Sequence, residues 1–252
     1  MFTGIGLISF CCIFGAGLAG LVLSRLLPDR LRTDGTQKVV QSVMNVVAIL
    51  SALVLGLLVA GTKSNFDTRN REVEQFATVL TLLDRELIHY GADAKTIRAS
   101  LRGFTQRKIA WTWPNDRGAA PMLHDEEAVH LLRDVEDGLL GLTPHNEIER
   151  AGRVTALQLT DELKRTSRIL AVQENSQTPR PFLIVVVLWL SVLFLSYAIF
   201  APLNAMVVAA MLVCAFSVSV AVNVTFDADQ PFQGFVRISP KPMLQALEQM
   251  KP

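Results

Sequence analysis

The sequence has little charge for its length, since only 19% of its 252 residues are Asp, Glu, Lys or Arg while 50% are apolar. Soluble domains carry about 25% charged residues, so a single soluble globular domain is excluded. The 24 basic and 23 acidic residues nearly cancel, giving a net charge of +1. Nucleic acid is therefore not an expected partner, because binding it needs a basic surface that displaces counterions.

Cysteine and histidine are also scarce, which limits the chemistry that the chain can carry. All three cysteines lie within apolar runs, so a disulfide framework is excluded. The four histidines have no metal-ligand spacing, and no Gly-rich phosphate loop or Ser/His/Asp constellation is present. We therefore expect neither an enzyme nor a cofactor nor a metal site.

One acidic run leaves an alternative open. Asp125, Glu126 and Glu127 follow His124 and could bind a divalent ion. The sequence favours a solvated first helical turn, where carboxylates stabilise the positive end of a helix. An enzyme stays a possibility only if a metal binds at this run.

Charge is concentrated in the middle of the chain, between apolar ends. Residues 62–181 hold 17 of the 24 basic and 18 of the 23 acidic side chains. Four apolar stretches lie outside this region, and each approaches or exceeds the roughly 20 residues that cross a membrane as a helix. We predict transmembrane helices at 4–27, 43–60, 182–200 and 204–224.

The predicted fold is all-α, an integral membrane protein with four transmembrane helices and a helical extramembrane domain between the second and the third. An even number of spans places both termini and that domain on one side, but the Lys and Arg beside the spans leave the orientation open. The expected domains are transmembrane helices 1 and 2 in 1–61, the helical domain in 62–181, transmembrane helices 3 and 4 in 182–224, and a C-terminal tail in 225–252.

The helical pattern of the second span continues into the charged middle. Apolar residues recur in steps of three and four from Phe66 to Tyr90, which is the pattern of a packed helical seam, and Gly91 is a C-cap candidate. A later helix is expected to open at Thr143-Pro144, with proline at its first position. Trp111 and Trp113 fit either the membrane interface or a cluster that caps this bundle. A bundle of helices is therefore expected for this domain.

The second span has two unlike faces when its residues are placed at intervals of about 100°. Branched aliphatic side chains, which suit lipid, cover one face. The opposite face carries small, amide and basic residues, which suit a protein contact or a water-filled path. We take this second face as the candidate pore lining: Gln41, Asn45, Ala48, Ala52, Leu55, Gly56, Val59 and Lys63.

Two interpretations of the candidate pore face remain open. The small residues from Ala48 to Ala60 form a small-xxx-small ladder, which usually means close packing of helices, and every bundle needs such packing. Alternatively, the face lines a pore that apolar rings at Leu55 and Val59 narrow. Ion-coupled transporters normally need an ionisable group within the membrane. The interiors of the four predicted spans contain no Asp, Glu, Lys, Arg or His, which suits a passive pore.

Three motifs carry a resemblance to a known family. They are Leu-Asp-Arg-Glu-Leu-Ile-His-Tyr-Gly at 83–91, Phe-Ala-Pro-Leu-Asn-Ala at 200–205, and a D-x-P-F-x-G motif in the tail formed by Asp229, Pro231, Phe232 and Gly234. With the order of two spans, a helical domain, two spans and a tail, the chain resembles the bacterial bestrophin-like family, which is remotely similar to bestrophin anion channels.

The residues of the tail motif also predict a local structure without reference to the family. Pro231 and Phe232 after the last span indicate a sharp exit turn, with Phe232 anchored at the interface and Gly234 supplying an unusual backbone angle. The alternative is a functional role, in which the motif ties the tail to a neighbouring subunit or shapes the pore mouth.

The resemblance implies a homo-oligomer, pentameric in bestrophins, whose second helix lines an anion-conducting pore. It also implies the cell (inner) membrane, with the helical domain and both termini cytoplasmic. The acidic calcium-binding cluster of animal bestrophins has no counterpart, because only Asp227 and Asp229 stand near the motif. The second span also lacks the aromatic neck of bestrophins, having no Phe before Phe66. Calcium gating is therefore not carried over.

The function expected from the sequence is a homo-oligomeric ion channel in the lipid bilayer, permeable to inorganic anions such as chloride. The alternative is a non-conducting membrane scaffold or sensor whose helical domain binds a protein partner. The two differ at the face of Asn45 and Ala52, which a scaffold would bury within one subunit.

Overall fold

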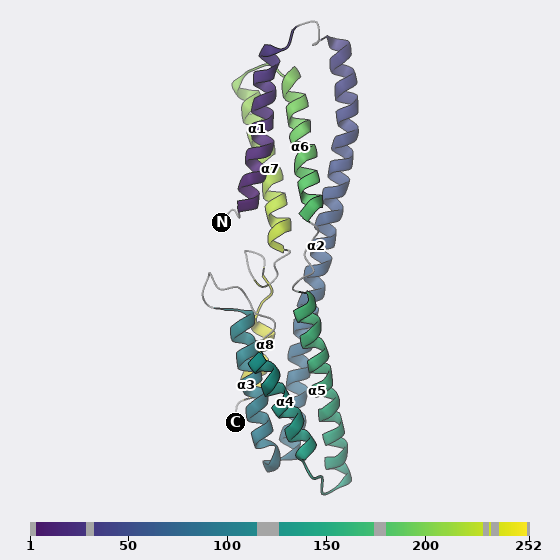
Figure 1. Ribbon diagram of the computed structural model, residues 1–252, viewed down its shortest axis with the longest axis vertical. Helices are drawn as coiled ribbons and strands as arrows, with labels where there is room; N and C mark the ends of the chain where they lie inside the picture. The colour runs from purple at the N-terminus through teal and green to yellow at the C-terminus, as the bar shows by residue number, and fades with distance from the viewer. Residues whose placement is uncertain are drawn as a thin grey trace. The chain divides into compact units, whose positions relative to one another are not determined.

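The computed structural model describes residues 4–28, 33–114, 126–173, 180–228, 232 and 237–250. The described residues are almost entirely helical and contain no strand, which confirms the all-α fold (Figure 1). The chain divides into two compact units. Unit 1 comprises residues 1–65 and 178–230, and unit 2 comprises residues 66–177 and 231–252.

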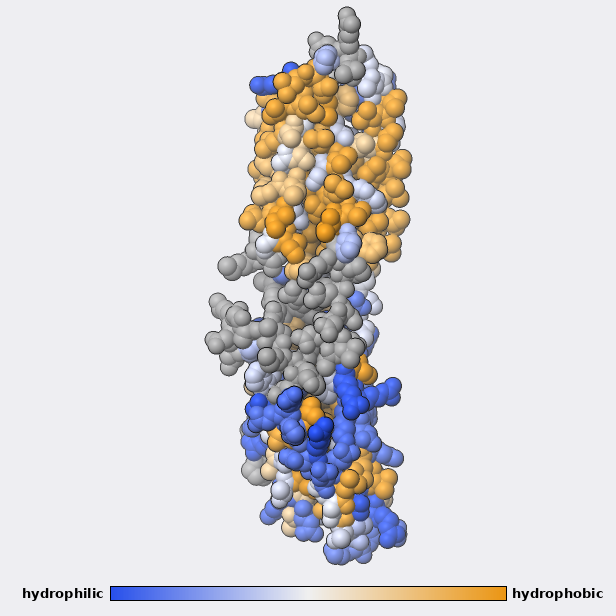
Figure 2. Space-filling model, in the orientation of Figure 1, coloured by the Kyte–Doolittle hydropathy of each residue, from blue (hydrophilic) through white to orange (hydrophobic). Residues whose placement is uncertain are grey.

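Unit 1 contains apolar helices at the four places where the sequence predicts spans. Among the described residues, four helices are long and apolar enough to cross a membrane. Figure 2 shows apolar residues over most of the visible surface of this unit. The four helices are α1 (Gly4–Leu26), α2 (Asp34–Tyr90), α6 (Arg180–Phe200) and α7 (Ala205–Ala228), of which α2 extends beyond unit 1.

Helix α1 packs against α6 and α7 through two glycines. A Cβ atom at Gly20 would lie 2.5 Å from the carbonyl oxygen of Leu195 and 2.7 Å from Cβ of Ala198, both on α6. At Gly17 it would lie 2.5 Å from Cε of Met211 on α7. Helices approach this closely only where side chains are small, so Gly20 sets the distance between α1 and α6, whereas at Gly17 the atom met is the end of a flexible side chain.

A short turn around Pro202 joins α6 to α7. Proline cannot continue the hydrogen-bond ladder of a helix, and α6 ends at Phe200. The side chain of Asn204 then caps α7, because its Oδ1 accepts a hydrogen bond from the backbone N–H of Val207 at 2.8 Å.

Unit 2 is a helical bundle whose core includes the predicted seam of α2. Val73, Phe76, Leu80, Leu83 and Leu87 are all buried in one cluster with residues of the other helices. The remaining elements of the unit are η2 (Ala92–Ala94), α3 (Lys95–Thr112), α4 (Glu126–Gly141), α5 (Glu147–Gln173) and α8 (Lys241–Gln249).

Gly91 ends α2 as the sequence predicts. Its φ of 90° is a conformation that residues with a side chain rarely adopt, and its N–H donates to the carbonyl of Ile88 at 3.1 Å. The chain can therefore turn directly from α2 into η2 and α3.

The predicted start of α5 is wrong, because the helix begins at Glu147 rather than at Thr143-Pro144. Asn146 Oδ1 accepts the N–H of Glu149 at 2.7 Å, and Glu149 Oε2 accepts the N–H of His145 at 2.7 Å. The first bond satisfies an N–H group that a helix start otherwise leaves without a partner, and the second ties the residue before the cap to the first turn. The two bonds therefore fix the start of the helix more strongly than the proline does.

Candidate functional site

The apolar half of α2 is the least covered helix in unit 1. Only 6% of its most apolar stretch is buried, compared with 33% for α1. In the part of α2 that belongs to unit 1, the fully buried residues are Ser51 and Thr62, and Val47, Val54 and Leu58 beside them are half-buried. This narrow stripe is where α2 packs within its own chain.

The candidate pore face lies largely outside this stripe. Asn45, Ala52, Gly56, Val59 and Lys63 are exposed, while Gln41, Ala48 and Leu55 are half-buried. The small residues of this face therefore differ in exposure along the helix. Ala48 is half-buried, whereas Ala52 and Gly56 are exposed.

The glycines of α2 contrast with those of α1. A Cβ atom added to Gly56 or Gly61 would meet no atom within 4 Å, whereas at Gly17 or Gly20 it would overlap a neighbouring helix. The glycine of the α2 ladder therefore makes no close contact inside this chain. The space beside Gly56 is not filled by this chain.

The aliphatic face of α2 is exposed as well. Val43, Val46, Leu53 and Leu57 are between 54% and 65% exposed. Branched aliphatic side chains match lipid tails or another apolar helix. The membrane half of α2 thus presents two different surfaces, one aliphatic and one made of small and polar residues.

Asn45 is tied to α6 by a hydrogen bond. The hydroxyl of Tyr197 donates to its Oδ1, with 2.5 Å between the two oxygens. Within the described part of the chain, this is the only hydrogen bond of the Asn45 side chain. Asn45 follows the start of α2 and Tyr197 precedes the end of α6, so the bond lies toward the loop ends of these helices.

Three serine hydroxyls in the apolar helices instead donate to a carbonyl of their own helix. Ser51, Ser191 and Ser217 each donate to the carbonyl oxygen four residues earlier, at 2.7 to 2.8 Å. Such internal bonds are the usual arrangement of serine in an apolar helix. Between residues 43 and 61 of α2, Asn45 is therefore the one exposed side chain with N–H donors to offer.

The described residue of the tail motif, Phe232, packs within unit 2. Its ring lies edge-on against that of Trp113, with 5.6 Å between centroids, and Trp113 Nε1 donates to the carbonyl oxygen of Ile238 at 2.9 Å. Trp113 therefore belongs to a cluster at the bundle, as one of the two sequence interpretations predicts for it. Asp229, Pro231 and Gly234 lie outside the described residues.

The acidic run of the sequence shows no metal centre in its described part. Glu127 forms an ion pair with Arg107 at 2.5 Å, while His124 and Asp125 lie outside the described residues. Across the ranges that the structure describes, no three His, Cys, Asp or Glu residues gather in a way that could hold a metal ion.

Sequence reasoning missed Tyr197, although a signal for it exists. The apolar stretch 182–200 contains one tyrosine, and the stretch 43–60 contains one asparagine. A polar group inside an apolar helix needs a partner, so two such residues in separate helices form a natural pair. Testing every pair of isolated polar residues across the spans would have proposed this contact.

Comparisons with known proteins agree with this architecture. Crystal structures of a bacterial bestrophin homologue from Klebsiella pneumoniae are similar in fold. One, a tyrosine-to-alanine variant, has a TM-score of 0.71 at 12% identity, covering 98% of each chain. A second, described as phased with zinc, has a TM-score of 0.70 at 13% identity, covering 97% of this chain and 96% of the other.

A further crystal structure, described only as a membrane protein, has a TM-score of 0.72 at 13% identity and covers 97% of each chain. No curated protein matches the sequence. A family model for the Bestrophin-like domain matches residues 11–243, which is nearly the whole chain. The protein is therefore a membrane protein that belongs to the Bestrophin-like domain family.

Proposed function

We propose that this protein is a homo-oligomeric ion channel, permeable to anions, in which the candidate pore face of α2 lines the pore. The family and the fold suggest a channel-type membrane protein. The observation that carries the proposal is that α2 leaves its small and polar face uncovered in the single chain, at Asn45, Ala52 and Gly56.

Lipid is a poor match for that face, because an amide side chain in hydrocarbon leaves its donors without partners. Copies of the chain arranged around an axis would place these faces toward a shared, water-filled centre. The aliphatic face of α2, with Leu53 and Leu57, would then contact lipid or neighbouring subunits. Five copies is the number that the family resemblance implies.

The pore would be passive and narrowed by apolar side chains. In the described parts of α1, α6 and α7 and in residues 39–62 of α2, side chains of Asp, Glu, Lys, Arg and His occur only near the helix ends. Leu55 and Val59 from each subunit would form apolar rings, of the kind that gate channels by excluding water. Lys63, at the end of this face, would favour anions electrostatically.

The proposed location is the cell (inner) membrane, with unit 2 and both termini in the cytoplasm. A non-conducting scaffold is the alternative, and it would bury the Asn45 and Ala52 face within one subunit. Both residues are exposed in the single chain. The exposure therefore favours the channel.

Chloride flux into proteoliposomes tests the proposal, with Ala52→Trp as the variant. Ala52 is exposed, so a larger side chain there has space within the subunit and would obstruct only the shared pore. Leu57→Trp is the matched control, since it adds an indole on the aliphatic face, where Leu57 is 65% exposed.

The expected result is flux in the wild type and in Leu57→Trp, and its loss in Ala52→Trp at unchanged oligomer size. Wild-type vesicles that conduct no better than empty ones, over a range of voltage and pH, would overturn the channel. Loss of the oligomer in Ala52→Trp alone would instead assign this face to contacts between subunits.

A further inference from the structure

The hydrogen bond between Tyr197 and Asn45 gives the proposed pore a chemical preference. We propose that Asn45 is an anion-coordinating residue, and that Tyr197 is its positioning residue on α6. This inference rests on the proposed function, because it requires that the exposed Asn45 faces a shared, water-filled centre.

The first step of the argument is the direction of the hydrogen bond. Asn carries one acceptor oxygen and two N–H donors on its amide. Tyr197 donates its hydroxyl to Oδ1, so the oxygen of the amide is engaged with the subunit's own α6. The two N–H groups on Nδ2 have no partner among the described residues. The exposed side chain of Asn45 can therefore offer N–H donors, but not its oxygen, to a ligand outside the chain.

The second step is that no charge competes with these donors in the membrane part of the face. From Val39 to Thr62 the helix carries no Asp, Glu, Lys or Arg. Ion preference in such a stretch depends on dipoles, as it does where rings of backbone carbonyls select cations. A ring of N–H groups has the opposite sign and favours anions.

The third step is that the tyrosine strengthens these donors. A hydrogen bond accepted by an amide oxygen polarises the amide, and chains of such bonds reinforce one another. Fixing the rotation of the side chain also removes part of the entropy that would otherwise be lost when an ion binds. Tyr197 would thus increase both the donor strength and the order of the Asn45 amide.

Replacing Asn45 with Asp separates this role from a merely structural one. A carboxylate still accepts the Tyr197 hydroxyl, and charge-assisted hydrogen bonds of this kind are about twice as strong as neutral ones. The tether between α2 and α6 is thus retained, while the two N–H donors are replaced by an anionic oxygen. A structural role predicts unchanged ion preference, and an anion-coordinating role predicts its loss.

The second variant is Tyr197→Phe, which removes the hydroxyl of the positioning residue. The chain offers a matched control for this variant and for Asn45→Asp. Asn204→Asp makes the same amide-to-carboxylate change at the turn that joins α6 to α7, where the side chain only caps a helix through Oδ1. Tyr90→Phe removes the hydroxyl of the only other tyrosine, which lies in unit 2. Each should leave ion preference unchanged.

The experiment measures reversal potentials of the purified protein in planar bilayers under asymmetric potassium chloride. We expect the wild type to prefer chloride, and Asn45→Asp to lower the chloride-to-potassium permeability ratio about tenfold, the effect of losing a hydrogen bond to a charged group. Tyr197→Phe should lower the ratio less while the oligomer and the conductance persist. Because Tyr197→Phe removes only one oxygen atom, this variant still tests the proposal if Asn45→Asp fails to assemble.

The failures of the two proposals are distinguishable. A wild type that carries no current overturns the proposed function and this site with it. A conducting wild type that prefers potassium overturns the anion site alone. So does an Asn45→Asp channel that keeps the wild-type ratio, or a Tyr197→Phe channel indistinguishable from Tyr90→Phe.

Discussion

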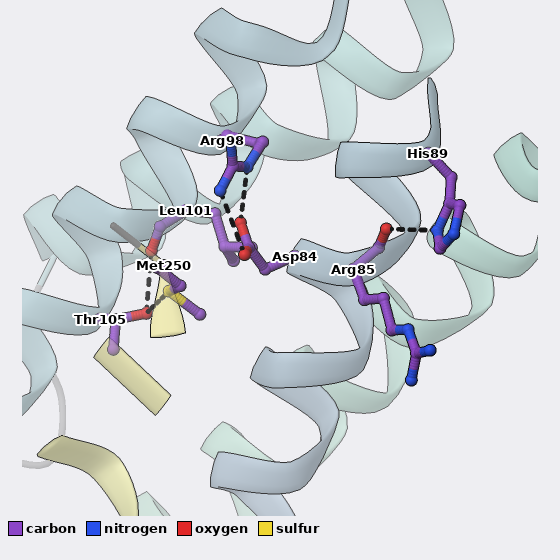
Figure 3. A network of polar contacts seen from close by, with 7 residues as sticks. All are labelled: Asp84, Arg85, His89, Arg98, Leu101, Thr105 and Met250. Atoms are coloured by element: carbon purple, nitrogen blue, oxygen red, sulfur yellow. Dashed lines mark hydrogen bonds and ion pairs between the residues drawn. The ribbon is translucent and has the colours of Figure 1, made fainter. Parts of the chain in front are cut away.

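Arg98 and Asp84 form a two-point ion pair that joins α3 to α2 inside unit 2 (Figure 3). Nε of Arg98 donates to Oδ1 of Asp84 at 2.8 Å, and Nη2 donates to Oδ2 at 3.3 Å. The side chain of Asp84 is 6% exposed and that of Arg98 is 22% exposed. The hydrogen bonds from Arg98 to Asp84 raise the pKa of Arg98. The pair thus joins Asp84, which lies in one of the motifs that carry the family resemblance, to a helix outside that motif.

Removing one partner of this pair should destabilise unit 2. Asp84→Ala would leave the guanidinium of Arg98 without its carboxylate, and breaking a buried pair costs about 3 kcal/mol or more. Urea unfolding in detergent, followed by circular dichroism, measures the loss. Glu147→Ala is the matched control, because the pair of Glu147 and Arg150 is exposed and should cost less than about 1 kcal/mol. Equal effects of the two variants would contradict the prediction.

The glycines of unit 1 predict opposite responses to the same substitution. Gly20→Ala places a methyl group 2.5 Å from the carbonyl oxygen of Leu195, so α1 and α6 must separate, at a cost of about 1–3 kcal/mol. Gly56→Ala meets no atom within the chain and improves helix propensity by about 1 kcal/mol. Thermal unfolding of the detergent-solubilised protein should therefore lower the Tm for Gly20→Ala only. A lower Tm for both variants, measured on the monomeric protein, would refute this difference.

The contact of Trp113 with the tail should control protease access to it. Trp113→Phe keeps an aromatic ring but loses the hydrogen bond to Ile238, which contributes about 1 kcal/mol. We expect faster cleavage of the C-terminal segment in limited proteolysis. Trp111→Phe is the control, because Trp111 is 36% exposed and lies under Arg107 rather than against the tail. Identical cleavage rates of the two variants would show that the tail is held by other contacts.

Tyr90 predicts a loss of stability at alkaline pH. Burial raises the pKa of Tyr90 above its ordinary value of 10.0, and the carboxylate of Glu149 raises it further. Its hydroxyl is buried without a hydrogen-bond partner among the described residues, so the fold favours the neutral form. A raised pKa gives stability that is fully present below the ordinary value and is lost as pH rises through the raised one.

The test compares the Tm of wild type and Tyr90→Phe from neutral pH to above pH 10. The difference between the two proteins isolates this group from lysines that titrate in the same range. We expect the wild type to lose stability relative to Tyr90→Phe as pH rises above about 10. Parallel curves across the whole range would rule out a contribution from Tyr90.

The sequence predicts the fold best where apolar residues stand out against a polar background. The seam from Phe66 to Leu87 is readable because charged residues separate its members, so periodicity marks the buried side. In the apolar helices both lipid-facing and packed residues are apolar. The packing stripe of α2, marked by Ser51 and Thr62, therefore lies between the two faces that the sequence distinguishes.

The candidate site was predictable only in part for a related reason. Asn45 stands out because an amide is rare in an apolar helix, but its partner depends on how α2 and α6 are rotated against each other. Such rotations depend on contacts between residues far apart in the sequence. The packing of Gly20 on α1 against Ala198 on α6 is an example. The start of α5 was missed for a local reason, because the capping by Asn146 and Glu149 outweighs the proline that precedes it.

The tail also has a consequence for the order in which the protein matures. Ile238, Met243 and Met250 belong to the core of unit 2, and Met250 contacts Thr105 of α3 through its sulfur (Figure 3). These residues leave the ribosome after α6 and α7, because synthesis proceeds from the N-terminus. Unit 2 therefore waits, with its last core positions unfilled, until both later apolar helices have been made. Chains that stop short of the tail would therefore leave apolar core positions of unit 2 uncovered, which chaperones and proteases recognise.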